Sequence, residues 1–240
     1  MFRKIVLVQL FLIIGTNYVF SNGVPEIGNG NIISIDRPVS STFTTIILGT
    51  NGLLNIYQSE KERISITIDS NLEYYIETEI IDGVLEIKTR KSNGIRPTVN
   101  TINVYTPNIE QLSILGTGNI MIIDMIVSES LLLNISGVGK ITGKVECTND
   151  LKLSISGNGN MRIAGKSTFL KIETSGSADI DCSELEVYEA AVRINGSGNV
   201  QLNVIDFLEG RIYGSGNILY HGKPRIAFDG FGSGNIRRID

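Results

Sequence analysis

The chain has 240 residues, of which 42% are hydrophobic and 19% charged, with 26 Gly, two Cys, one His and no Trp. This length supports one elongated domain or two small ones, and the apolar content excludes a disordered chain. One histidine and two cysteines argue against a His/Cys metal cluster and exclude a disulfide framework. We therefore expect no cofactor.

Residues 1–21 have the pattern of a secretory signal peptide. Arg3 and Lys4 precede an apolar run over residues 5–14, and a plausible cleavage site follows Ser21. The apolar run is shorter than the roughly 20 residues needed to span a bilayer. We expect an exported protein of the periplasm, cell envelope or extracellular space, with no membrane span after removal of the peptide.

The charge of the remaining chain disfavours nucleic acid as a partner. Without residues 1–21 the chain keeps 19 basic residues against 25 acidic ones. A protein that binds nucleic acid needs a basic face to neutralise phosphates. This composition predicts none.

The second half of the chain repeats the pattern Gly-x-Gly-Asn-Ile seven times. Successive copies are separated by 18 to 21 residues. A repeat of about 20 residues is typical of a solenoid in which each repeat is one coil. The copies begin at Gly116, Gly137, Gly157, Gly176, Gly196, Gly214 and Gly232.

The residues around each bend have the period of a β-strand. When the copies are aligned on their final apolar residue, apolar side chains recur eight and six positions earlier, with mostly polar residues between them. Each coil is thus predicted to be strand, Gly-x-Gly-Asn bend, strand and a variable connection. Glycine suits the bend because it tolerates positive φ and close backbone approach.

The residues before the repeats divide into two parts. Residues 22–36 are interpreted as a flexible lead, and residues 37–110 as a strand-rich N-terminal part with a hairpin at Asp82-Gly83. The repeats occupy residues 111–240. We expect an all-β fold, a parallel β-helix-like solenoid of seven coils preceded by this strand-rich part.

Several segments of the chain resemble the head GIN domain family, whose members are described as auto-transporter adhesins of the bacterial envelope. The segments are Arg37-Pro38-Val39, the strand ending at Ile87, the run from Val104 to Ile109 and the glycine repeats. The resemblance covers roughly residues 37–240. It implies an all-β fold resembling a parallel β-helix and an adhesive role.

The outward face of the strand before each bend is a candidate binding surface. Tyr213 and Phe231 are aromatic residues at equivalent places in adjacent coils, and Arg193 and Arg211 lie on the same face. Aromatic rings in such a position stack on sugars or on partner proteins. We therefore name these four residues as the candidate site, for a glycan or a surface protein. A solubilising surface with two packed aromatics is the alternative.

Ion pairs are expected to link neighbouring coils on this face. The alignment places Glu173 beside Arg193, and Arg211 beside Asp229. Opposite charges directly across adjacent strands attract each other. The sequence leaves open whether the protein forms an oligomer.

A carbohydrate-active enzyme is the main functional alternative, because glycoside hydrolysis uses two nearby carboxyl groups. Asp179 and Asp181 alternate onto one outward face, followed by Glu184, Glu186 and Glu189. However, Arg162 occupies the place of Asp181 one coil earlier, so an ion pair explains Asp181 more simply. We expect no catalytic residue here.

The remaining candidates for chemistry are single residues. His221 is the only histidine and is interpreted as a surface imidazole. Cys147 and Cys182 fall at different phases of the repeat, so a disulfide requires the connections to bring them together. Cys182 occupies an inward position and is interpreted as a small core residue.

Together these patterns favour an exported, non-enzymatic β-solenoid that presents an extended surface for adhesion or envelope interaction. A polysaccharide hydrolase or lyase and a structural or assembly protein of the envelope are the two alternatives. The sequence does not identify the ligand.

Overall fold

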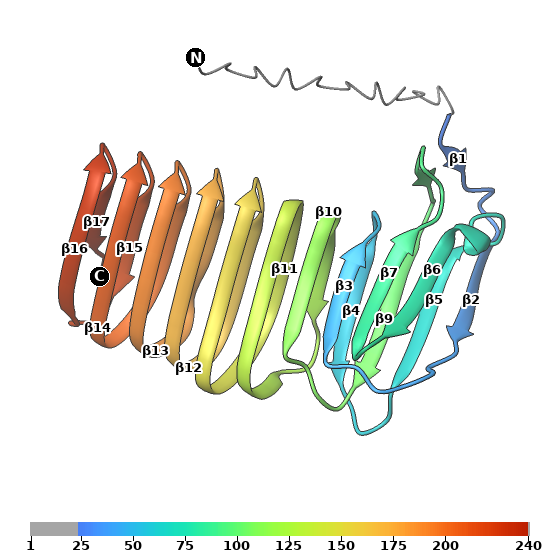
Figure 1. Ribbon diagram of the computed structural model, residues 1–240, viewed down its shortest axis with the longest axis horizontal. Coiled ribbons are helices and arrows are strands. Elements are labelled where there is room, and N and C mark those ends of the chain that lie inside the picture. Colours follow the sequence, from blue (N-terminus) through green and yellow to red (C-terminus); the bar gives the residue numbers. More distant parts are fainter. Residues whose placement is uncertain (1–23, 240) are drawn as a thin grey trace, which may run out of the picture.

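The computed structural model describes residues 24–239 and is nearly all β, with 74% of residues in strands and 1% in helix (Figure 1). The predicted signal peptide, residues 1–21, lies outside the described residues. Among the described residues, no helix has the length and apolar character needed to cross a membrane. The all-β solenoid predicted from the sequence is confirmed.

The N-terminal part contains short strands and one 3-10 turn, η1 (Glu73–Tyr75). The strands are β1 (Glu26–Ile27), β2 (Ile32–Arg37), β3 (Thr45–Gly49), β4 (Leu53–Gln58), β5 (Arg63–Asp69), β6 (Ile76–Ile81), β7 (Val84–Thr89), β8 (Ile95–Arg96) and β9 (Asn100–Thr106).

The repeats form long strands that mostly run from one bend to the next. They are β10 (Gln111–Ile122), β11 (Ile126–Gly157), β12 (Asn160–Gly176), β13 (Asp179–Gly196), β14 (Asn199–Gly214), β15 (Asn217–His221), β16 (Arg225–Gly232) and β17 (Asn235–Arg238). Each pairs in parallel with its counterpart in the next coil, and the seven bends enclose about six turns (Figure 1). The predicted count of seven coils is thus a count of bends.

The inward positions predicted from the alignment form a continuous aliphatic core. Ile135, Ile155 and Ile194 lie six residues before the reference position in their coils, and each is at most 1% exposed. Ile141 and Ile180, at the reference position itself, are buried as well. Burial of such columns is the main stabilising term of a solenoid, because each coil contacts only its neighbours.

The glycine bends stack directly on one another. The first glycine of each copy has positive φ, for example +117° at Gly176 and +139° at Gly214. A Cβ at Gly176 would overlap the carbonyl oxygen of Gly157 in the preceding coil, and one at Gly214 would overlap that of Gly196. Both reasons proposed for glycine at this position are therefore present in the structure.

The N-terminal part supplies further coils of the same stack, but out of chain order. β3 and β4 pair in parallel with the first and second halves of β10. β7 pairs in turn with β3, and β9 with β4, again in parallel. The solenoid therefore extends past the repeats into residues 45–106 (Figure 1).

Antiparallel strands close this end of the stack. β5 pairs with β9, β2 pairs with β5, and β6 pairs with β7 through the turn at Asp82-Gly83. Asp82 and Gly83 both have positive φ, 49° and 78°, as the predicted hairpin turn requires.

The structure differs from the interpretation of residues 22–36 as a flexible lead. Residues 32–36 lie in β2, which forms a six-residue antiparallel ladder with β5. The side chain of Asp69 holds the preceding loop, because its Oδ1 accepts the N–H of Gly30 at 2.7 Å. The alternation of Ile33 and Ile35 with the polar residues Ser34 and Asp36 is the sequence feature that could have identified this strand.

Candidate functional site

The predicted binding residues lie together near the C-terminal end of the repeats. Tyr213 and Phe231 are aligned in neighbouring strands, and their rings stack with centroids 6.3 Å apart and planes 19° from parallel. The guanidinium of Arg193 lies 5.5 Å from the ring centre of Tyr213. These three side chains form a column that we call the Arg–aromatic column (Arg193, Tyr213, Phe231). Phe231 is 76% exposed, so its ring is accessible to a ligand.

The cross-coil ion pairs predicted for this face are replaced by others. Glu173 pairs with Lys152 and Lys171, each at 3.1 Å, rather than with Arg193. Arg193 lies directly opposite Glu173, but its guanidinium lies over the ring of Tyr213, whereas Lys171 on the same strand and Lys152 on the preceding one reach the carboxylate. The two lysines hold the pKa of Glu173 below its usual value against a smaller opposing effect of burial.

Arg211 also has a different partner from the one predicted. It pairs at 2.6 Å with Glu209, two residues earlier on the same face, rather than with Asp229. Arg193 and Arg211 line a shallow depression of about 200 Å³ together with Lys171, Glu173 and Glu209. This depression adjoins the Arg–aromatic column and offers both charged donors and acceptors.

The carboxylates proposed for catalysis are engaged in hydrogen bonds. Asp179 accepts the backbone N–H and the side-chain amide of Asn199 at 3.2 and 3.1 Å. Asp181 forms the predicted ion pair with Arg162 at 3.2 Å and accepts two hydrogen bonds from Ser183. Partial burial acts to raise the pKa of Asp181. The hydrogen bonds from Ser183 and the charge of Arg162 together outweigh burial, so the pKa of Asp181 is lowered. A general acid needs the opposite shift.

A groove that the sequence did not predict crosses the strands that come directly after the glycine bends. It has a volume of about 580 Å³, and a second hollow of about 300 Å³ shares Asn199 and Leu219 with it. Asn160 and Asn199 line the groove, Asn217 and Asn235 line the second hollow, and Asn217 donates to Asn199 at 2.9 Å. Its walls combine amides with Arg162 and Asp181.

A second aromatic stack lies in the N-terminal part. Tyr57 and Tyr105 are aligned in β4 and β9, with ring centroids 4.5 Å apart and planes 11° from parallel. Arg63 lies 5.9 Å from the ring centre of Tyr105. Both tyrosines are half-buried, whereas Phe231 is largely exposed. The sequence missed this stack because β4 and β9 become neighbours only through out-of-order stacking.

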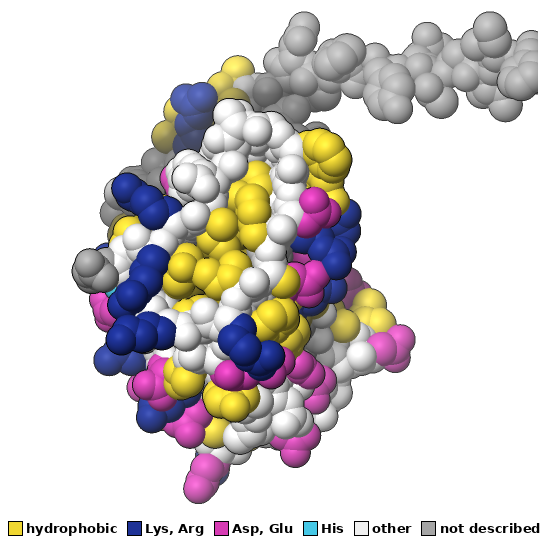
Figure 2. Space-filling model, turned by 90° about the vertical axis from the view of Figure 1, so that its left-hand side faces the viewer, with side chains coloured by type: hydrophobic (Ala, Val, Ile, Leu, Met, Phe, Trp, Pro, Cys, Tyr) yellow, Lys and Arg dark blue, Asp and Glu magenta, His cyan; other side chains and the backbone are white. Residues whose placement is uncertain are grey.

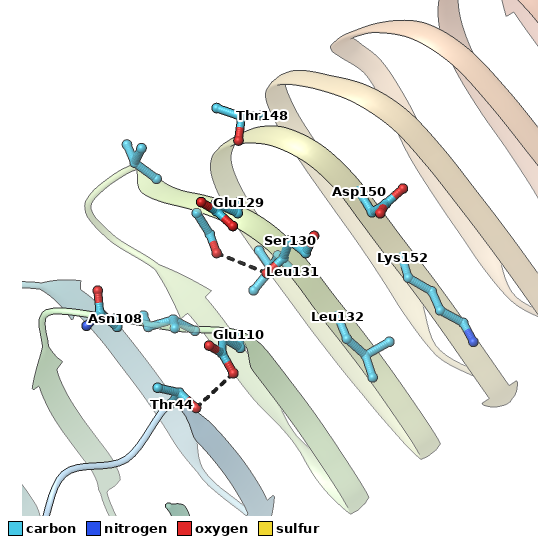
Figure 3. A pocket seen from close by; sticks show the side chains of 13 residues that line it. Thr44, Asn108, Glu110, Glu129, Ser130, Leu131, Leu132, Thr148, Asp150 and Lys152 are labelled. Atoms are coloured by element: carbon cyan, nitrogen blue, oxygen red, sulfur yellow. Dashed lines mark hydrogen bonds between the residues drawn. The ribbon is translucent and has the colours of Figure 1, made fainter.

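A cavity of about 710 Å³ lies where the N-terminal part meets the first coils (Figure 3). Thr44 donates to Glu110 at 3.1 Å on one side, and Asp150 and Lys152 project from β11 on the other. Lys152 is already paired with Glu173. Among the described residues, no cluster of three His, Cys, Asp or Glu side chains is arranged to hold a metal ion.

The single-residue candidates occupy structural positions. Cys147 and Cys182 are both buried and form no disulfide with each other. Burial raises the pKa of the Cys147 thiol to about 11 and that of Cys182 further still, so neither is a reactive thiolate. The His221 ring lies 3.3 Å from the side-chain nitrogen of Gln201.

A comparison with protein families settles which group the chain is part of. The family described as "Putative auto-transporter adhesin, head GIN domain" matches residues 42–224. The chain belongs to the head GIN domain family. The match begins just before β3, so the head GIN domain includes the N-terminal coils as well as most of the repeats.

Solved structures share the fold of this head GIN domain. A putative adhesin from Bacteroides fragilis superposes with a TM-score of 0.82 at 23% identity, over 89% of this chain and 99% of the other. A putative lipid binding protein from Parabacteroides distasonis gives 0.70 at 26% identity, with the same two coverages. A putative adhesin from Parabacteroides merdae gives 0.68 at 22% identity, over 91% and 100%. No curated protein matches the chain.

Proposed function

We propose that this head GIN domain is exported and acts as a non-enzymatic adhesin, binding a glycan or a surface protein through Arg193, Arg211, Tyr213 and Phe231. The observation that carries the proposal is the stacking of Tyr213 on a Phe231 ring that is 76% exposed, with Arg193 above Tyr213. Membership of a family described as adhesins supports the same function. Export rests on the signal-peptide pattern of residues 1–21.

The chemistry of this face suits a saccharide. The apolar face of a sugar ring packs on an exposed aromatic side chain, and arginine donates hydrogen bonds to hydroxyl or carboxylate oxygens. The depression beside the column adds Glu173 and Glu209 as acceptors. A flat sheet with both donors and acceptors fits an extended chain of sugars better than a small molecule, which binds in an enclosed pocket.

The enzymatic alternative has weaker support. Glycoside hydrolysis needs one carboxyl group that is protonated near neutral pH. The pKa of Asp181 is shifted downward, and Asp179 is hydrogen-bonded to Asn199. Arg162 and Lys166 lie within 4 Å of Glu184 and Glu186, so these carboxylates already have ion-pair partners. A structural or assembly role in the envelope remains the other alternative.

The test is binding of residues 22–240 to arrays of glycans and matrix proteins. Tyr213→Ala/Phe231→Ala should abolish saturable binding, because it removes both stacking rings. Tyr57→Ala/Tyr105→Ala is the matched control, since it removes the other stacked pair and should leave binding intact. Binding that survives the first variant would refute this site, and binding to nothing on either array would refute the adhesin proposal.

Lipid binding is a second candidate, favoured by one surface feature. Four apolar residues along one segment expose 42–51% of their area: Met121, Ile123, Met125 and Val127, the last of which lines the 710 Å³ cavity. One structural neighbour is named as a putative lipid binding protein. Co-sedimentation with phosphatidylethanolamine–phosphatidylglycerol vesicles, lost in Ile123→Ser/Met125→Ser, would support this function; no co-sedimentation would eliminate it.

A further inference from the structure

The last coil leaves apolar core positions uncovered. Ile226 and Phe228 are 42% and 44% exposed, whereas Leu208, the neighbour of Ile226 in β14, is fully buried. Figure 2 shows apolar side chains at the centre of this end of the molecule, bordered by Lys and Arg. At the other end, Ile64, Ile66 and Ile68 of β5 are fully buried beneath β2. Inward-facing apolar side chains are therefore exposed at the β16 end and covered at the β2 end.

The backbone of β16 is also unpaired on one side. Within residues 24–239, β16 pairs only with β14, so its other edge presents free N–H and C=O groups. An exposed edge strand with apolar side chains is a template for pairing with another strand. Charges on the edge restrict which strand fits.

The sequence of β16 is complementary to itself. Around Ala227, the outward positions two residues away are Arg225 and Asp229, and the inward positions one residue away are Ile226 and Phe228. Antiparallel pairing of two copies centred on Ala227 places Arg225 opposite the partner's Asp229 and Ile226 opposite the partner's Phe228, each twice. Parallel pairing in register would place Arg225 opposite the partner's Arg225. Antiparallel pairing centred on Asp229 would bring two aspartates together.

We propose that two copies of this chain form a two-fold dimer through antiparallel pairing of β16, centred on Ala227. The pairing joins the two aliphatic cores and gives the backbone of residues 225–229 hydrogen-bond partners along the edge. Arg225 already pairs with Asp206 of its own chain at 2.9 Å. Its five N–H donors allow it to bind the partner's Asp229 in addition.

The dimer has a consequence for the exposed face. The two-fold axis of an antiparallel strand pair stands perpendicular to the sheet, so the outward surfaces of both copies face the same side. Two Arg–aromatic columns would then lie on one surface, and a polymeric ligand could bind both at once. Such bivalence raises apparent affinity without new contacts. The dimer itself does not depend on the proposed adhesin function.

The first test is sedimentation velocity of residues 22–240 with charge-reversed variants. We expect a dimer, weakened on the order of tenfold or more by Arg225→Asp or Asp229→Arg, because each places like charges opposite each other twice. The double variant Arg225→Asp/Asp229→Arg should restore it. Lys166→Glu is the control, since this exposed lysine lies on an inner coil. A wild-type monomer, open-ended polymers or failure of the double variant to rescue would each overturn the proposal.

A second test uses cysteine at the symmetry axis and does not depend on destabilised variants. Ala227→Cys places two thiols directly opposite each other, within the 4.4–6.8 Å Cα separation of disulfides. We expect a covalent dimer under mild oxidation. Asp229→Cys is the control, because in this register its two copies lie about 13 Å apart along the strands. Equal cross-linking of both variants would refute the register.

Discussion

The repeats and the N-terminal coils bury apolar side chains at the same inward positions, but their bends differ. In both, apolar residues occupy the same places relative to the bend: Ile46 and Leu48 lie eight and six residues before Leu54, as Leu112 and Ile114 do before Ile120. All of these side chains are at most 1% exposed. The inward columns therefore define a coil in either region.

The difference lies in how one bend meets the next. In the repeats, each bend is a copy of its neighbour, and glycine stacks on the carbonyl of glycine. In the N-terminal part, a short bend at Asn51-Gly52 lies beside a longer connection over residues 90–99, which contains β8. Asn100 bridges the two by donating to the carbonyl of Asn51. The comparison predicts that the stacking of like bends adds a second requirement for glycine to the one that positive φ already imposes.

Substitution of glycine at equivalent bends separates these two requirements, and here we expect the largest effect. Gly176→Ala introduces a Cβ that overlaps the carbonyl of Gly157, in addition to the strain at a φ of +117°. Gly116→Ala has a comparable φ of +92° but meets nothing within 4 Å. We expect a loss of about 3 kcal/mol or more for Gly176→Ala, against about 1 kcal/mol for Gly116→Ala.

Urea unfolding of both variants measures this difference. Equal losses would mean that backbone conformation alone explains the glycines. The comparison between stacked and unstacked bends would then fail.

Truncation of one core residue in each region tests whether the two share a single core. Leu54→Ala in β4 and Ile141→Ala in β11 each remove a fully buried side chain. Each should lower the free energy of unfolding by about 3 kcal/mol. We expect both losses in one cooperative transition by circular dichroism, because β10 packs on both regions.

Two separate transitions, each sensitive to only one substitution, would contradict this expectation. They would show that the N-terminal coils unfold independently of the repeats.

The repeat coils were predictable because their length varies little. With 18 to 21 residues between copies, alignment on one apolar residue places every inward position and every bend. That register also placed Tyr213 beside Phe231 and Arg162 beside Asp181. The N-terminal coils were not recognised, although Ile46, Leu48 and Leu54 show the same spacing.

Two physical reasons explain what the sequence could not provide. First, the coils of residues 45–58 and 84–106 stack in reverse chain order. In the second coil Ile87 and Ile102 are 15 residues apart, whereas the corresponding residues of a repeat are six apart. Second, long charged side chains choose among several neighbours, so Glu173 pairs with lysines on two coils rather than with Arg193. Strand register fixes Cα positions, but it does not fix which flexible side chain reaches a carboxylate.

The pH dependence of stability probes the closed N-terminal end. Asp69 is fully buried, and its two oxygens accept the N–H groups of Gly30 and Thr98, each at 2.7 Å. Burial alone raises the pKa of this carboxyl, but the N–H donors outweigh it and the pKa is lowered. A lowered pKa stabilises the fold above the unfolded value of about 4, and this contribution is lost as pH falls through the folded pKa.

Asp69→Asn should therefore destabilise the protein at neutral pH, since the amide offers one acceptor oxygen for two donors. It should also reduce the loss of stability below about pH 4. Urea titrations between about pH 3 and pH 7 measure both effects. Asp36→Asn, at an exposed ion pair with Arg63, serves as the control and should change neither. An unchanged pH profile for Asp69→Asn would refute this role.

The smallest expected effect on stability comes from replacing a buried threonine by valine, and its sign differs between the two regions. Thr174 is buried in the isoleucine column between Ile155 and Ile194, and its hydroxyl has no hydrogen-bond partner. Thr50 is equally buried in the N-terminal part, but its hydroxyl bonds that of Thr89 at 2.6 Å. Valine has the same shape without the hydroxyl, so Thr174→Val should stabilise the protein by about 1 kcal/mol, whereas Thr50→Val should destabilise it by a similar amount.

Thermal unfolding of the two valine variants, measured side by side, decides the point. Opposite shifts would show that the repeats tolerate a hydroxyl where a purely aliphatic column would be more stable, while the irregular N-terminal bend depends on its polar bonds. Two destabilised variants would mean that Thr174 has a partner in solution, and the repeat core would then be less uniform than its alignment implies.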